Sequence, residues 1–395
     1  HALYQGPAPA LTILVPAYKE DAAVVAQTLW SALLQDYPNR RVVLLIDNPP
    51  QTGSATDAAE LLTMRTLPAR LQQILARPRR RFAACLAAFE RRAAAGAIDP
   101  QQELVRLSRL YAEVAAWFED LALRQNITGH TDMLFVEKIL HWHRDAHVLQ
   151  ARELRLRQPD MQRQPDQGEL LAHYRRLAAL FSAEVSAFER KLYANLSHEP
   201  NKAMNLNSYI GLVGKSFCVR GEGVQRTLEP ADPAQADLSV PDTDFFITLD
   251  ADSLILPDYA LRLVHYMQQP ANARVAVAQT PYSAIPAAPG TLERIAGATT
   301  DIQYLIHQGF TGYDATYWVG ANALLRKTAL MDIAVTQLER GYSVTRYIQD
   351  RTVIEDTESS IDLVARGWSL YNYPERLAYS ATPPDFGALV IQRGR

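Results

Sequence analysis

The chain has 395 residues, of which 48% are hydrophobic and 21% charged, so it can bury a large core and is not of the disordered class. Its formal net charge of -3 excludes a general nucleic-acid binder, which needs a positive face. Two cysteines, Cys85 and Cys218, exclude a disulfide framework and favour a reducing compartment. No apolar run is long enough to cross a bilayer, and we expect both chain ends to be cuts in a longer polypeptide.

The first part of the chain predicts a βαβ unit with a parallel sheet. Residues 11–15 and 41–46 are apolar stretches typical of buried strands, and residues 22–34 between them have helical spacing. Ligands of such sheets bind beyond the carboxyl ends of the strands. The residues that fall there are Tyr18, Glu20 and Asp47.

From residue 56 to residue 197 the sequence predicts long helices. Apolar side chains recur at alternating spacings of three and four, for example over residues 104–121 and 171–192. Such stripes predict helices that pack on one another, so we expect an all-helical insertion. His143 and His147 have a spacing that can bind zinc, but a solvated or helix-packed histidine face is the favoured interpretation.

The last part of the chain returns to an α/β pattern and carries two acidic pairs. An apolar strand predicted at residues 245–249 delivers Asp250 and Asp252 into the following loop, where such a pair can hold a hard divalent cation. Aspartate also favours turns for its own backbone hydrogen bonds, so the pair alone is a weak indicator. Glu355 and Asp356 begin a predicted helix, a position that the helix dipole also favours for acidic residues.

The order of these acidic residues resembles the processive family-two glycosyltransferases, the group that includes cellulose synthase, chitin synthase and hyaluronan synthase. Residues 16–20, Pro-Ala-Tyr-Lys-Glu, look like the family's first-strand signature. Residues 202–207, Lys-Ala-Met-Asn-Leu-Asn, are similar to the Lys-Ala-Gly-Asn-Leu-Asn stretch of cellulose synthases. Residues 319–327 resemble a segment that lies near the acceptor in the family, and Gln392 with Arg395 resembles its Gln-x-x-Arg motif.

The resemblance implies a GT-A fold, which is a Rossmann-like α/β domain with a mostly parallel sheet. We expect its nucleotide-binding first part at residues 1–55, the all-helical insertion at 56–197, and its second part at 198–395. The likeness covers the two flanking parts and says nothing about the insertion.

The resemblance also implies roles for the matching residues. Asp252, with Asp250 alongside, would hold Mg²⁺ or Mn²⁺ at the pyrophosphate of a UDP-sugar. Asp47 would accept a hydrogen bond from the uracil ring. Asp356, with Glu355 beside it, would be the general base that takes a proton from the acceptor hydroxyl. The expected nucleotide-sugar contacts are Tyr18, Glu20, Asp47, Lys202, Asp250, Gln392 and Arg395.

These expectations describe the cytosolic catalytic domain of a membrane-embedded, inverting polysaccharide synthase that moves a hexose from a UDP-sugar, with UDP-glucose favoured, to a growing β-glycan. Amphipathic segments at residues 292–310 and 388–391 would lie on a bacterial-type inner (plasma) membrane, beside spans outside this chain. The family often has a second aspartate where Asn48 stands, and threonine where Ile354 stands. Two alternatives stay open: transfer of a single sugar to a lipid or protein, and a nucleotide-sugar-binding scaffold without turnover.

Overall fold

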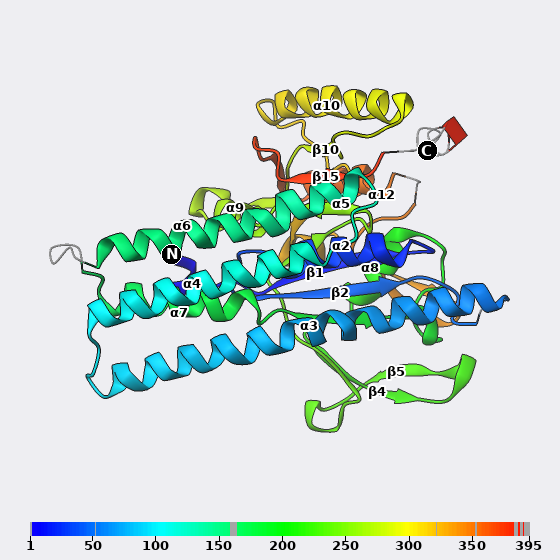
Figure 1. Ribbon diagram of the computed structural model, residues 1–395. Helices are drawn as coiled ribbons and strands as arrows, with labels where there is room; N and C mark the ends of the chain where they lie inside the picture. The colour runs from blue at the N-terminus through cyan, green and yellow to red at the C-terminus, as the bar shows by residue number, and fades with distance from the viewer. Residues whose placement is uncertain are drawn as a thin grey trace.

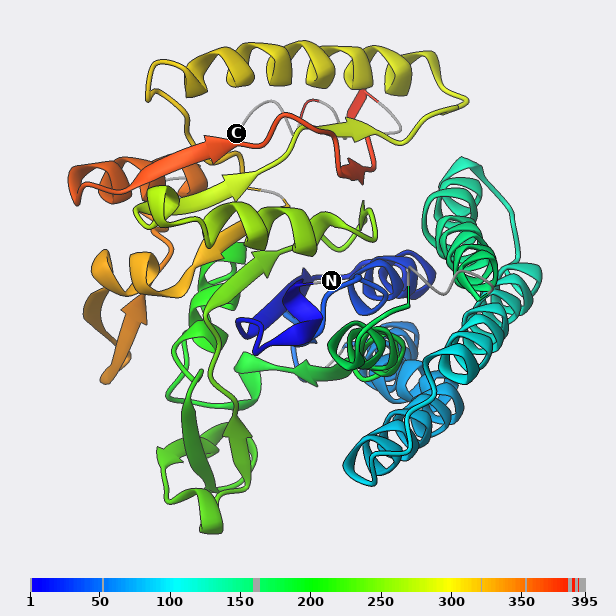
Figure 2. The same ribbon diagram turned by 90° about the vertical axis from the view of Figure 1, so that its left-hand side faces the viewer.

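The computed structural model describes residues 2–51, 53–158, 164–320, 322–351, 354–382, 386–387 and 390. Within this part of the chain, a seven-stranded sheet lies at the centre of the molecule (Figures 1 and 2). β11 runs antiparallel to its neighbours β7 and β9, and the other neighbouring pairs are parallel. The predicted α/β class with a mostly parallel sheet is therefore confirmed. In spatial order the strands are β14 (Ser369–Asn372), β9 (Val275–Gln279), β11 (Ala323–Arg326), β7 (Phe245–Thr248), β1 (Leu11–Ala17), β2 (Arg40–Ile46) and β3 (Glu184–Phe188).

Both faces of the sheet are buried, which explains why its strands are continuous apolar runs. Successive side chains of a strand point to opposite faces. Ile13 of β1 accordingly belongs to one apolar cluster, and Leu14 belongs to another on the opposite face. Helices contribute to each cluster: α2 (Ala22–Leu33), α9 (Tyr259–Met267) and α3 (Ala55–Ala94) to the first, and α8 (Lys202–Ile210), α11 (Lys327–Asp332) and α12 (Glu355–Ala365) to the second.

In the described part of the chain, three smaller sheets and the helix α10 also lie around this core. α10 (Thr291–Thr311) lies at the top of the molecule in Figure 1, over β10 (Tyr282–Ala284) and β15 (Ala378–Ser380). β10 and β15 form a sheet with β8 (Ser253–Ile255). The other two sheets are β5 (Thr227–Pro230) with β4 (Lys215–Arg220) and β6 (Leu238–Val240), and β12 (Val335–Glu339) with β13 (Tyr342–Arg346).

The predicted helical insertion is a group of long helices that pack side by side at one side of the sheet (Figure 2). The apolar stripe of residues 104–121 is buried in it, as its spacing predicts. His143 and His147 are buried too, and each bonds a backbone carbonyl, so the helix-packed interpretation is the one that the structure supports. The helices are α3, α4 (Pro100–Leu123), α5 (His130–Phe135), the π-helix Val136–His141, α6 (Trp142–Arg157) and α7 (Gln167–Leu180).

The helix predicted over residues 171–192 is wrong in its second half. α7 ends at Leu180, and residues 184–188 form β3, which extends the main sheet beside β2. The carbonyls at the end of α7 are taken by two arginines: Arg40 donates to Leu180 O at 2.9 Å and Arg79 to Phe181 O at 3.1 Å. Such capping satisfies the carbonyls that a helix end leaves unpaired. The range 56–197 therefore contains a strand of the main sheet as well as helices.

In the described residues, no helix combines the length and the apolarity that crossing a membrane requires.

Candidate active site

A pocket of about 830 Å³ opens at the carboxyl ends of β1, β2 and β7. Residues that follow each of these strands line it, as expected for the ligand site of a parallel sheet. The described lining carries six carboxylates and two cationic side chains. Basic residues outside the lining also pair with two of the carboxylates: Arg190 and Lys191 with Asp47, and Arg346 with Asp350. The carboxylates are Glu20, Asp47, Asp250, Asp252, Asp350 and Glu355, and the cationic side chains are Lys202 and Arg351.

Asp250 and Asp252 occupy the loop after β7, as predicted. The loop is anchored to the core, because the buried Thr28 donates to the Ala251 carbonyl at 2.8 Å. Burial raises the pKa of Asp252 to about 7, and the charges of Asp250 and Glu20 add to this rise. A carboxylate whose charge is so poorly balanced is a position where a bound cation is favourable.

A divalent cation fits this donor set only with help from a ligand. No group of three or more potential metal-binding side chains occurs in the described residues. Mg²⁺, however, keeps several waters and is commonly held by one or two carboxylates together with substrate phosphates. Asp250 and Asp252 match that pattern, and these two residues would hold the ion.

Lys202, the first residue of α8, connects the two acidic pairs. Its ammonium group donates to the Asp250 carboxylate and to the Gly320 carbonyl, the latter at 2.9 Å. Burial opposes the charge of Lys202, but the charges of Asp250, Glu355 and Asp356 outweigh it and raise the lysine pKa. The contact of Lys202 with a diphosphate stays a prediction. The described partners of its ammonium group are Asp250 and Gly320.

Glu355 and Asp356 form the first turn of α12. Asp356 Oδ1 accepts a hydrogen bond from Thr357 N at 2.7 Å, so the carboxylate satisfies one N–H group in the first turn of its own helix. Its other oxygen faces Gly320, where a Cβ atom would lie only 2.6 Å from Asp356 Oδ2. Burial raises the pKa of both Glu355 and Asp356. The predicted base is therefore linked to the predicted metal site through two residues: Asp356 faces Gly320, whose carbonyl accepts from Lys202, and Lys202 donates to Asp250.

Asp47 lines the pocket as predicted, but its carboxylate has partners that the sequence interpretation missed. Arg190 Nε donates to Oδ1 at 2.7 Å and Arg190 Nη2 to Oδ2 at 3.1 Å, in fork geometry. Lys191 Nζ lies 3.3 Å from Oδ2 and 5.7 Å from the centre of the Tyr18 ring, which is 54% exposed. Both basic residues follow β3. Recognising residues 184–188 as a strand of the parallel sheet would have placed Arg190 and Lys191 at the same sheet edge as Asp47.

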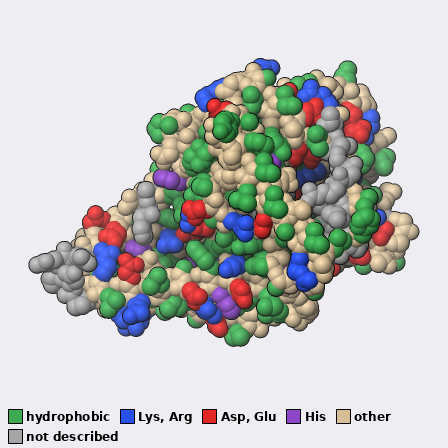
Figure 3. Space-filling view, turned by 90° about the horizontal axis from the view of Figure 1, so that it is seen from above, with side chains coloured by type: hydrophobic (Ala, Val, Ile, Leu, Met, Phe, Trp, Pro, Cys, Tyr) green, Lys and Arg blue, Asp and Glu red, His purple; other side chains and the backbone are tan. Residues whose placement is uncertain are grey.

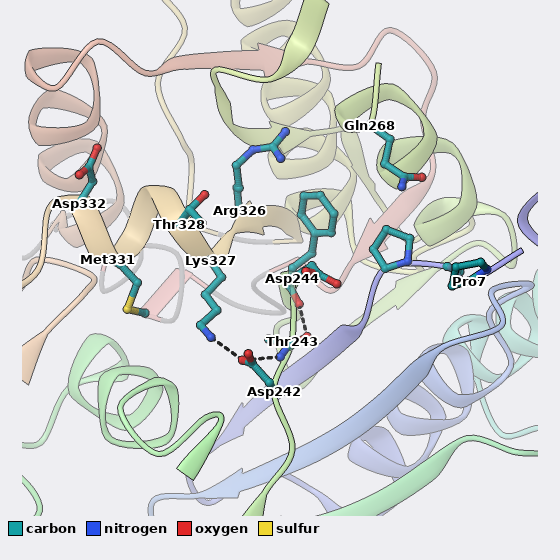
Figure 4. Close-up of a pocket in the computed structure, with 13 residues that line it drawn as sticks. Pro7, Asp242, Thr243, Asp244, Gln268, Arg326, Lys327, Thr328, Met331 and Asp332 are labelled. Atoms are coloured by element: carbon teal, nitrogen blue, oxygen red, sulfur yellow. Dashed lines mark hydrogen bonds and ion pairs between the residues drawn. The ribbon is translucent and has the colours of Figure 1, made fainter. Parts of the chain in front are cut away.

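The segment at residues 319–327 spans the sheet instead of lying wholly near the acceptor. Because β11 is antiparallel to β7, only its first residues are at the active-site edge, and Arg326 pairs with Phe245 at the opposite edge. There Arg326 and Lys327 line a second pocket of about 840 Å³, where Lys327 contacts Asp242 (Figure 4). The prediction that residues 319–327 lie near the acceptor is therefore wrong for Arg326 and Lys327, because the direction of β11 places them at the opposite edge of the sheet.

The structure brings most of the predicted site residues to one place. Asp356 is outside the described lining: it follows Glu355, which lines the pocket, and faces Gly320, whose carbonyl accepts from the lining residue Lys202. Gln392 and Arg395 lie outside the described residues. The predicted residues that line the pocket are Tyr18, Glu20, Asp47, Lys202, Asp250, Asp252 and Glu355.

Comparisons with solved structures give only a weak likeness. The crystal structure of S. aureus TarS 1-349 is 9% identical with a TM-score of 0.33, over 94% of this chain and 60% of that chain. A crystal structure of S. aureus TarS is 8% identical with a TM-score of 0.33, over 97% of this chain and 38% of that chain. The chain thus spans less than two thirds of either, and at such TM-scores the likeness is no basis for inference.

A family comparison is more informative, although it covers less than half of the chain. No curated protein matches the sequence. Residues 245–395 match the family model described as "Glycosyl transferase family group 2". This range supplies both acidic pairs of the site, at residues 250–252 and 355–356. The match of residues 245–395 to this family therefore supports glycosyl transfer as the chemistry of the site.

Proposed function

We propose that this pocket binds a UDP-sugar together with Mg²⁺ or Mn²⁺ and transfers its hexose, with inversion, to a hydroxyl of a growing β-glycan. The observation that carries the proposal is the carboxylate pair after β7: Asp250 and Asp252 line the pocket together, and burial and the charges of Asp250 and Glu20 raise the pKa of Asp252 to about 7. An anionic diphosphate is repelled by such a lining unless a cation accompanies it. The two carboxylates that follow β7 supply the oxygen ligands that a hard divalent cation prefers.

The two acidic pairs have different tasks in this proposal. Asp250 and Asp252 hold the cation, which when bound supplies Lewis-acid stabilisation of the leaving diphosphate. Lys202, between the pairs, keeps Asp250 oriented through their ion pair. On the nucleotide side, Asp47 offers its carboxylate to the base, with Tyr18 at the exposed rim of the pocket.

Asp356 is the general base. Its burial raises the pKa of its carboxyl group, so it holds a proton more readily than an exposed aspartate does. A base is most effective when its pKa approaches the working pH. The acceptor hydroxyl would lose its proton to Asp356 as its oxygen attacks the anomeric carbon, and the bond to the nucleoside diphosphate would break in the same displacement.

The replacement Asp356→Asn tests this assignment. It keeps the shape of the side chain and its hydrogen bond from Thr357 N but removes the base. We expect transfer from a radiolabelled UDP-sugar to fall by about 10²- to 10⁴-fold, the range for losing a general base, while Mn²⁺-dependent UDP binding measured by calorimetry is retained.

The control for this experiment is Asp120→Asn, which changes an exposed aspartate of the insertion. It should leave both transfer and binding unchanged. Full activity of Asp356→Asn would refute the general base. Binding of UDP-sugars by the wild-type protein without any transfer would favour a nucleotide-sugar-binding scaffold instead.

The membrane setting of this reaction is a separate part of the proposal, and α10 supports it. Four large apolar side chains of this helix point away from the protein, and Figure 3, which looks down on this side of the molecule, shows hydrophobic side chains spread across it. An amphipathic helix of this kind can lie in the plane of a membrane surface. The side chains are Ile295 (57% exposed), Ile302 (57%), Leu305 (73%) and Ile306 (54%).

Two measurements decide the setting and the product. Flotation with anionic vesicles should recover the wild-type chain and lose the variant Ile302→Gln/Leu305→Gln, whereas equal flotation of both would refute a role for α10. The length of the labelled product separates polymer synthesis from the addition of one sugar to a lipid or protein acceptor.

A further inference from the structure

Arg190 is completely buried beside the nucleotide end of the pocket, at 0% exposure. It lies just after β3, and its guanidinium group grips both oxygens of Asp47 through Nε and Nη2. A fork of two parallel, charge-assisted hydrogen bonds fixes the plane of a carboxylate as well as its position. Asp47 is thereby held in one orientation.

The same guanidinium group also fixes the chain that leads into α8. Arg190 Nη1 donates to the Ser197 carbonyl at 2.5 Å, and Nη2 donates to the Glu199 carbonyl. A few residues later, Asn201 caps α8 by accepting a hydrogen bond from Met204 N at 2.7 Å. One side chain therefore links the residue that follows β2 to the segment that positions Lys202.

Arg190 is itself held from two directions. The preceding residue, Glu189, forms a two-point ion pair with Arg65 of α3, with both N–O distances at 2.7 Å. From the other side, Glu339 of β12 accepts a hydrogen bond from Ser197 Oγ at 2.9 Å. The position of the guanidinium group therefore depends on the helical insertion as well as on the α/β core.

The two hydrogen bonds from Arg190 do not use all the acceptor capacity of the Asp47 carboxylate, so it can still accept a hydrogen bond from a base. A carboxylate has about four acceptor sites, and Arg190 uses one on each oxygen. Lys191 Nζ lies 3.3 Å from Oδ2, so the acceptor site without a described partner is on Oδ1, and Asp47 lines the pocket where a ligand could reach it. We propose that Arg190 is a positioning residue for base selection: it presents Asp47 to a ring N–H, which uracil has at N3 and cytosine lacks. This inference rests on the proposed function.

Calorimetric titration of UDP and CDP in the presence of Mn²⁺ tests the inference on the full chain. We expect the wild-type protein to prefer UDP. In Arg190→Met the Kd for UDP should rise about 10- to 100-fold, the range for losing a residue that orients a binding group, whereas the Kd for CDP should change little. Asp47→Asn should lose the same preference, because the NH2 group of the amide cannot accept from Arg190 and the two-point contact that orients this side chain is broken.

The double variant Arg190→Met/Asp47→Asn separates positioning from a merely structural role. If the two residues act as one unit, the double variant binds UDP no more weakly than the weaker single variant. It removes the fully buried Arg190 charge together with the Asp47 charge and leaves only the partly exposed Lys191 without its carboxylate, so it gives a result even if Arg190→Met does not fold. Arg190→Lys, which keeps the charge without the fork, should show the same loss of base preference.

The matched control is Arg40→Met, which removes another buried arginine from the opposite end of β2. Its side chain donates to the Leu180 carbonyl, far from the pocket lining, so this variant should lose stability and keep its preference for UDP. A folded Arg190→Met protein that still prefers UDP, or additive losses in the double variant, would overturn the inference alone. A wild-type protein that binds neither nucleotide would overturn the proposed function, and the inference with it.

Discussion

Gly320 is the residue at which the two acidic pairs of the site meet. Its carbonyl accepts from Lys202, and its α-carbon faces Asp356. Its φ of +80° lies in the left-handed region, where a side chain is disfavoured. Glycine is therefore needed here twice, once for the backbone conformation and once for the space that the Asp356 carboxylate occupies.

Replacing Gly320 with alanine should separate these two demands. The added Cβ atom would lie 2.6 Å from Asp356 Oδ2 and displace the carboxylate, so we expect transfer to fall about 100-fold with UDP binding preserved. Gly96→Ala is the control, because Gly96 has a φ of +63° and nothing within 4 Å of the added atom. Both variants should lose about 1–2 kcal/mol of stability, and only Gly320→Ala should lose activity. Equal activities would contradict this account of Gly320.

Asp252 gives a second prediction at the scale of a residue. Its pKa is raised to about 7 in the folded protein, above the ordinary carboxyl value, so the folded state binds more protons than the unfolded state between these values. Its contribution to stability is present at low pH and is lost as the pH rises toward 7. With a chelator present at pH 8, Asp252→Asn should therefore stabilise the protein by about 1–3 kcal/mol, allowing for water in the pocket.

Thermal unfolding between pH 5 and pH 8 measures this effect. The difference between Asp252→Asn and the wild-type protein should shrink as the pH falls, whereas the exposed control Asp120→Asn should show no such trend. A wild-type protein that is the more stable of the two at pH 8 would show that the Asp252 charge is well balanced in the folded state.

At the scale of elements, α4 and α6 pack through buried histidines. The His143 ring stacks on Phe118 with 4.5 Å between ring centres, and His147 lies one turn further along α6. Burial lowers the pKa of His143 to about 3 and that of His147 to about 4. Both side chains are therefore neutral in the folded protein near neutral pH. When the protein unfolds in acid, each imidazole becomes exposed and takes up a proton.

The replacement His147→Gln should make the protein less sensitive to acid. The unfolded state takes up a proton on each histidine below its ordinary pKa and the folded state does not, so stability is complete above about pH 6.5 and falls as the pH drops toward 4. Each histidine contributes a slope of about 1.4 kcal/mol per pH unit in this window. Urea unfolding from pH 4.5 to pH 7 should show a shallower slope for His147→Gln and an unchanged slope for the exposed His265→Gln.

Elements could be predicted from the sequence wherever one physical signal dominated. The stripe over residues 104–121 predicts a helix because one face of that helix is buried along its whole length. Asp47 and Asp250 could be placed together because residues that follow buried parallel strands meet at one edge of a sheet. β3 was missed, since Val185 and Phe188, its buried side chains, are three residues apart and imitate a helical face. Its partners on β2 are distant in sequence, and local spacing carries no information about them.

At the scale of the whole molecule, the insertion and the α/β core share one interior. A single apolar cluster contains Ile13 of the sheet and Phe118 of α4. Trp30 of α2 and Trp117 of α4 lie edge to face, with 6.5 Å between ring centres. Arg176 of α7 pairs with the buried Asp36 at 2.6 Å. The division at residues 55 and 197 is therefore a division of the sequence more than of the packed core.

Unfolding should accordingly be a single event. Chains of this length often unfold through intermediates, but here neither part can expose its share of the interior without exposing the other. Far-UV circular dichroism follows the helices, and fluorescence follows all five tryptophans, two in the insertion and three in the α/β core. The two signals should give coincident thermal transitions. Two separated transitions would show that the insertion is an independent unit.

The crowding of carboxylates in the pocket has a consequence for the order of events in solution. On the proposed function, a bare nucleotide that diffuses toward this pocket would be repelled by the carboxylates of its lining, whereas the same nucleotide already complexed with its ion would not. The rate of productive encounters would then follow the level of free divalent ions as closely as it follows the level of the nucleotide. Raising the ionic strength would reduce the difference in encounter rate between the bare and the ion-bound nucleotide, because salt screens the repulsion by the carboxylates.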